Sequence, residues 1–194
     1  MTFNIEHFKK QKNTYIMKLT LLISIFLLIN NSIFCQDKAA RIAEIKKMYA
    51  EATELSLKKK DCISGKKIEY EGFDEASEKM PFEQTAEKCK LANNYVSISA
   101  SLQGYEWNSN VTYYYKNDKL FFVFISNGAE ACIVEYRVYF DENQKIIKLL
   151  EKSNDCDGGD LKKNNEITDA KEFDETMQLI EQNKIKIDEI LINK

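Results

Sequence analysis

Histidine is almost missing from this chain, since His7 is the only one in 194 residues. It lies upstream of an apolar segment that we expect to be removed on export. The mature protein would then carry no imidazole, which excludes serine–histidine triads, cysteine–histidine dyads and zinc sites with histidine ligands. No assumption about the fold is needed for this exclusion.

Proline and glycine are also scarce, with one and six residues respectively. Their scarcity argues against a disordered or linker-rich chain. The sequence holds no Cys-x-x-Cys pair, no phosphate-cradling glycine loop and no Gly-x-Ser-x-Gly motif. We therefore predict no catalytic residue and no cofactor. The chain has 28 basic and 31 acidic residues and a net charge of −3, with no dominant basic patch, so nucleic acid is not an expected partner.

The segment Leu19–Phe34 has the features of a secretory signal: a preceding Lys18, the apolar run LLISIFLL and a less apolar exit. Its apolar run falls short of the about 20 residues needed to span a bilayer. We predict that residues 1–35 are an upstream segment and signal peptide of a bacterial protein. Residues 36–194 would be a single secreted or periplasmic domain without a membrane span. A lipid anchor at Cys35 is the alternative, and the bulky Phe34 argues against it.

Four cysteines remain in the mature chain, and an even number in an exported protein predicts two disulfides. Three pairings are possible for Cys62, Cys89, Cys132 and Cys156. A hairpin that places Cys132 opposite Ser153 would bring Cys156 close to Cys132, so we favour Cys132–Cys156 and, with it, Cys62–Cys89. Each bond would stabilise the fold by about 2–4 kcal/mol.

Two segments have the apolar period of helices. Residues Asp37–Lys59 repeat apolar side chains every three or four positions, as a helix lying on a sheet does. Residues Asp169–Asn183 open with the capping pattern Asp169 to Glu172, and we extend this helix to about Ile192.

Between the helices the chain alternates apolar and polar residues in the way of β-strands. Turns are expected at Gln103-Gly104, Asn117-Asp118, Asn127-Gly128 and Asp141–Gln144, with a bulge at Ser109. The predicted strands are Tyr95–Leu102, Tyr105–Lys116, Leu120–Ser126, Ala131–Phe140 and Lys145–Lys152.

The strand Leu120–Ser126 is apolar on both sides, which requires cover on both faces of the sheet.

Residues Asp61–Lys90 are harder to interpret. We expect a weak edge strand at Lys66–Phe73, a loop around Pro81 and a helical turn at Glu83–Lys88. The predicted fold class is α+β: an N-terminal helix packed on a twisted antiparallel meander of four to five strands, a C-terminal helix and two disulfides.

Two groups of side chains could form ligand sites. An aromatic set could line an apolar cavity, although aromatic strand faces more often form core; it comprises Trp107, Tyr113, Tyr115, Phe122 and Phe124. An acidic set has the spacing of weak Ca²⁺ ligands, although a polar loop is the simpler interpretation; it comprises Asp155, Asp157, Asp160 and Glu166.

The missing catalytic sets and the small cross-linked domain favour an exported, non-catalytic binding domain. Its partner would be a protein or an envelope component, bound through the sheet face or an exposed edge. The alternative is a small-molecule binder, or a hydrolase-like enzyme that uses Asp, Glu and Tyr in a cavity between helix and sheet. A pocket with two or more convergent carboxylates or tyrosines would favour the alternative.

Overall fold

The computed structural model divides the chain into two compact units, Met1–Arg41 and Ile42–Lys194. It describes residues 37–58, 61–72, 79–104, 106–154, 156 and 159–192. The predicted leader and Cys35 lie outside the described residues, and so does Tyr105. Among the helices that are described, none is long and apolar enough to cross a membrane.

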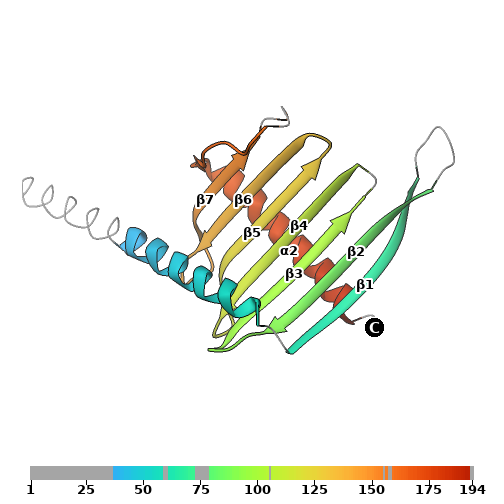
Figure 1. The fold of residues 1–194 in the computed structure, drawn as a ribbon. Helices are drawn as coiled ribbons and strands as arrows, with labels where there is room; N and C mark the ends of the chain where they lie inside the picture. The colour runs from blue at the N-terminus through green and yellow to red at the C-terminus, as the bar shows by residue number, and fades with distance from the viewer. Residues whose placement is uncertain are drawn as a thin grey trace, which may run out of the picture. The chain divides into compact units, whose positions relative to one another are not determined.

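The second unit is built on one eight-stranded sheet (Figure 1). Its strands are β1 (Asp61–Gly72), β2 (Lys79–Lys90), β3 (Tyr95–Gln103), β4 (Trp107–Lys116), β5 (Lys119–Ala129), β6 (Cys132–Phe140), β7 (Ile146–Ser153) and β8 (Asn165–Ile167). Each strand pairs antiparallel with its neighbour in sequence, so the sheet is a meander as predicted. The predicted number of four to five strands is wrong, because β1, β2 and β8 also belong to the sheet.

The helical turn predicted at Glu83–Lys88 is wrong, because these residues belong to β2, which pairs with both β1 and β3. The expected apolar alternation is weak in residues 82–90 of β2, because the buried residues there are small or polar. Gln84, Ala86 and Cys89 are 7%, 3% and 1% exposed. None of them contributes the large β-branched or aromatic side chain by which strands are usually recognised.

The turn between β4 and β5 is the predicted one, with Asn117 and Asp118 at φ 49° and 61°. Positive φ at both central residues is the signature of a two-residue hairpin turn. The turn predicted at Asn127-Gly128 is wrong. There β5 continues to Ala129, and the chain reverses at Glu130, whose φ is 50°.

The bulge predicted at Ser109 is also wrong, because Ser109 pairs regularly with Asn127. The pairing of β4 with β5 instead shifts between Tyr114 and Tyr115, which leaves Phe121 without a paired residue. As a result Phe121 and Phe122, although consecutive, are both buried in the same cluster. An extra residue in a strand has this effect on side-chain direction.

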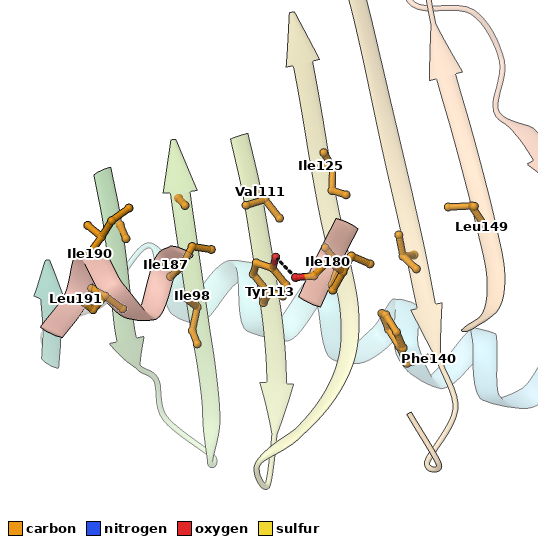
Figure 2. Packing of buried hydrophobic residues seen from close by; sticks show 14 residues of the cluster. Ile98, Val111, Tyr113, Ile125, Phe140, Leu149, Ile180, Ile187, Ile190 and Leu191 are labelled. Atoms are coloured by element: carbon orange, nitrogen blue, oxygen red, sulfur yellow. Dashed lines mark hydrogen bonds between the residues drawn. The ribbon is translucent and has the colours of Figure 1, made fainter. Parts of the chain in front are cut away.

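The helix α2 (Ala170–Ile192) covers one face of the sheet and extends as far as predicted. It begins after Asp169, whose carboxylate accepts a hydrogen bond from the Lys171 amide at 2.7 Å. Figure 2 shows Ile180, Ile187 and Ile190 of α2 over the apolar side chains of the strands. The fully buried Tyr113 donates a hydrogen bond to the carbonyl oxygen of Ile180 at 2.9 Å.

The N-terminal helix is described from residue 37 to residue 56, and its part within the second unit, residues 42–56, covers the opposite face of the sheet (Figure 1). Ile45, Met48 and Ala52 pack there on Phe121 and Phe122. The prediction that helices cover both sides of the central strand is therefore confirmed.

Both predicted disulfides are present, as Cys62–Cys89 and Cys132–Cys156. The first joins residues directly opposite each other on β1 and β2. The second does not follow from the predicted pairing with Ser153, which lies opposite Val134. A bulge between Tyr139 and Phe140 shifts that pairing, while Cys156 still reaches Cys132 from beyond the end of β7.

A polar contact ties the N-terminal helix to the turn between β2 and β3 and to the start of β3. Glu51 accepts hydrogen bonds from the Asn93 amide and from the Tyr95 hydroxyl, both at 2.9 Å. Lys116 donates to the same hydroxyl at 2.9 Å. The hydrogen bonds from Asn93 and then Tyr95 hold the pKa of Glu51 below its ordinary value.

We expect Glu51→Gln to destabilise the protein at neutral pH and to lose this effect in acid. A carboxylate whose pKa is lowered by folding stabilises the fold above its unfolded pKa, and this stabilisation disappears as pH falls through the folded pKa. Urea unfolding of wild type and variant at pH 7 and pH 3 measures the difference. The exposed Glu130→Gln serves as control; a gap between wild type and Glu51→Gln that is unchanged from pH 7 to pH 3 would contradict the expectation.

Candidate functional site

The face of the sheet that carries the N-terminal helix has an open polar region over β1 to β4. It forms a hollow of about 620 Å³. We call it the hydroxyl hollow, and its polar uncharged side chains are Ser64, Thr85, Ser99, Ser101, Asn110 and Thr112. Their placement follows from strand alternation: Ala86, Ala100 and Val111, which lie between them in sequence, are buried in the cluster under α2.

The strand register arranges these side chains in two rows across the sheet. One row runs from Ser64 to Glu87, Ser99 and Thr112, each opposite the next. The second row runs from Lys66 through Thr85 and Ser101 to Asn110 in the same way. Four adjacent strands contribute these side chains. The hydrogen-bonded backbone of the sheet, and not a flexible loop, therefore sets the spacing of the hydroxyl groups.

The hollow has no net charge. Its cation, Lys66, forms an ion pair with Glu83 at 2.8 Å, and its anion is Glu87, which has interactions of its own. Toward β6 the same face continues to Arg137, whose guanidinium is held by Glu135 at 2.8 Å and Asn164 at 3.0 Å. Lys66 and Arg137 are thus both paired within the protein, and most of the polar side chains that line the hollow are uncharged hydroxyl and amide groups.

The predicted aromatic residues do not share one cavity. Tyr113 and Tyr115 lie in the cluster under α2, where burial raises the pKa of Tyr115 to about 12. Phe122 and Phe124 belong to the cluster under the N-terminal helix. Trp107, at the start of β4, stacks on Phe82 with ring centroids 5.2 Å apart. The structure therefore separates this set between two faces of the sheet.

The predicted acidic residues are only partly described. Asp155 and Asp157 lie outside the described residues, and Asp160 is exposed. Glu166 lies on β8, where its carboxylate pairs with Lys148 at 2.9 Å.

Another group of potential metal ligands lies beside the hydroxyl hollow. Ligand atoms of Cys62, Glu87 and Cys89 lie within 4.8 Å of one another. Both sulfur atoms belong to the disulfide, however, and a disulfide offers no thiolate to a metal.

A smaller groove of about 230 Å³ lies beside the C-terminal end of α2. Its walls include Glu69 and Glu189 together with Lys67 and Lys186. Glu69 pairs with Lys67 and accepts a hydrogen bond from Gln84 at 3.0 Å. The hydrogen bond from Lys67 is the main cause that lowers the pKa of Glu69, so this carboxylate is not held protonated as a general acid must be.

The residues of the hydroxyl hollow were not among the predicted site residues. The alternating polar series Ser97, Ser99 and Ser101 was visible in the sequence. Its extension to Ser64 and Thr85 was not, because it depends on β2, for which we predicted a loop around Pro81 and a helical turn at Glu83–Lys88.

No family model matches this chain, and no curated protein or solved structure shows significant similarity to it.

Proposed function

We propose that this chain is an exported, non-catalytic binding domain that attaches to a component of the bacterial envelope through the hydroxyl hollow. The observation that carries the proposal is the hollow itself: an open region of about 620 Å³ with hydroxyl and amide side chains held on four paired strands. Polar side chains on a rigid scaffold are suited to binding because little conformational freedom is lost on association.

Export is part of the proposal and is supported by the two disulfides, since such bonds persist in oxidising compartments. We propose further that residues 1–35 are removed and that the mature protein carries no lipid at Cys35. Mass spectrometry of the natural product measures both, and a mature chain that begins with an acylated cysteine would contradict the second.

The alternative of a cavity between the N-terminal helix and the sheet has less support. The rings of Tyr49 and Phe122 lie 4.5 Å apart between these layers, and Tyr114 adds an edge contact to Tyr49 at 5.2 Å. Aromatic rings at these distances are packed against each other. In the hydroxyl hollow, Glu87 is the one carboxylate among the described lining residues, so a pair of carboxylates does not converge there.

The test is to block the hollow with a large side chain at its centre. We expect Ser101→Trp to weaken binding of the purified protein to envelope fractions of its own cells about tenfold or more, equivalent to about 1.4 kcal/mol of binding free energy. Cosedimentation at increasing protein concentration measures the apparent affinity. Gln178→Trp, on an exposed position of α2, is the matched control and should bind as wild type does. Equal affinities of Ser101→Trp and wild type would overturn the proposal.

A further inference from the structure

We propose that the ligand of the hydroxyl hollow is a neutral glycan strand, an inference that rests on the proposed binding function. The hollow offers five hydroxyl groups and one amide, from Ser64, Thr85, Ser99, Ser101, Thr112 and Asn110. Each of these groups can both donate and accept hydrogen bonds. The hydroxyl groups of a sugar have the same double capacity, so they are complementary to these six side chains.

Charge argues against the anionic polymers of an envelope. The hollow contains one lysine, and its ammonium is already paired with Glu83 at 2.8 Å. Glu87 adds a carboxylate on the same surface. Recognition of phosphate or carboxylate groups relies on Arg and Lys that are available to pair with them. A phosphodiester polymer or an acidic lipid headgroup would find no such group among the described lining residues.

The lining also differs from that of a protein interface. Binding energy between proteins is concentrated in aromatic, arginine and other large anchors buried at the centre of the contact. The described lining of the hollow has no aromatic residue and no aliphatic residue larger than alanine, and Ala86 and Ala100 belong to the cluster on the other face.

The arrangement of the two rows suits an extended ligand. Neighbouring strands lie about 4.8 Å apart, so a row across four strands is about 14 Å long. The register places Ser64, Ser99 and Thr112 along one row and Thr85, Ser101 and Asn110 along the other. A short glycan segment lying across the strands would meet hydroxyl or amide groups on both of its edges.

The first test removes hydroxyl groups without changing the shape of the hollow. Valine replaces threonine with nearly the same volume and favours strands. Each lost hydrogen bond weakens binding about fivefold, so we expect the double variant Thr85→Val/Thr112→Val to bind envelope fractions of its own cells about twenty-five-fold more weakly than wild type does. Thr168→Val, at an exposed position outside the sheet, is the matched control. Unchanged or tighter binding by the double variant would overturn the glycan assignment, because an apolar contact tolerates or gains from valine.

The second test identifies the bound material. One envelope sample is treated with mild periodate, which cleaves vicinal diols, then reduced with borohydride and washed. Another sample is digested with protease, and the purified protein is added to both. Binding that is lost after periodate and kept after protease supports the inference. Binding that is kept after periodate and lost after protease identifies a protein partner, which overturns the inference while the proposed binding function stands. Absence of binding to untreated envelope overturns both.

Discussion

Phe122→Ala should lower the free energy of unfolding by about 3–5 kcal/mol, the range for removal of a large buried aromatic side chain. Phe122 is 2% exposed and packs against the N-terminal helix and the neighbouring strand β6. Its ring centroid is 4.5 Å from that of Tyr49 on the N-terminal helix and 5.1 Å from that of Tyr139 on β6. Alanine would leave a cavity that these rings cannot fill without moving the helix. Urea unfolding followed by circular dichroism measures the loss.

Phe124 provides the matched comparison, because it lies two residues along the same strand and on the same face. It is only partly buried, and the Arg137 guanidinium lies 5.4 Å from the centre of its ring. We expect Phe124→Ala to lower the free energy of unfolding by about 1–2 kcal/mol, in proportion to the smaller area buried. Equal losses for the two variants would show that the N-terminal helix does not pack on Phe122 in solution.

Asn154→Ala should lower the free energy of unfolding by about 2–4 kcal/mol, because it removes several hydrogen bonds between a buried side chain and partly buried backbone groups. Asn154 is 2% exposed. Its amide nitrogen donates to the Ala131 carbonyl at 2.7 Å, and its side-chain oxygen accepts from the amides of Ile133 at 2.8 Å and Cys156 at 3.2 Å. This one side chain thus organises the end of the β6–β7 hairpin and the loop that carries the disulfide.

Thermal or urea unfolding of oxidised Asn154→Ala measures this loss. Asn143→Ala is the control, since Asn143 is an exposed turn residue whose backbone amide, not its side chain, bonds to Asp141. We expect the control to remain within about 0.5 kcal/mol of wild type, as surface substitutions do. A loss below 1 kcal/mol for Asn154→Ala would mean that water replaces the missing side chain.

The sequence predicted the strands with strong apolar alternation and failed where alternation is weak. The positions of β3 to β7 followed from residues such as Ile98, Val123 and Leu149, all of which are buried. In residues 82–90 of β2 the buried residues are Gln84, Ala86 and Cys89, so neither size nor hydrophobicity identified the strand. Its place in the sheet is determined by tertiary contacts with β1, β3 and α2, which local patterns do not contain.

The bulges were missed for a related physical reason. Phe121 and Phe122 are equally apolar, so their sequence does not show that both lie on one face. The register shift depends on how β4 pairs with β5. It also determines which aromatic residues lie on the same face of the sheet. For this reason the aromatic residues that we predicted to line one cavity came from both faces of the sheet. The hydroxyl hollow could not be predicted, because it depends on the pairing of four strands.

The order of the strands has a consequence for how the chain folds. Every strand pairs with the one just before it, and the disulfides join residues only 27 and 24 positions apart. Local pairing of this kind allows a sheet to grow hairpin by hairpin as a polypeptide emerges, since each loop closure is short. The helices depart from this local order, and α2, the last element, contacts β1, the first strand. Until those final residues arrive, the apolar side chains that α2 covers are open to water, and a chain that ended early would present them to aggregation or proteolysis.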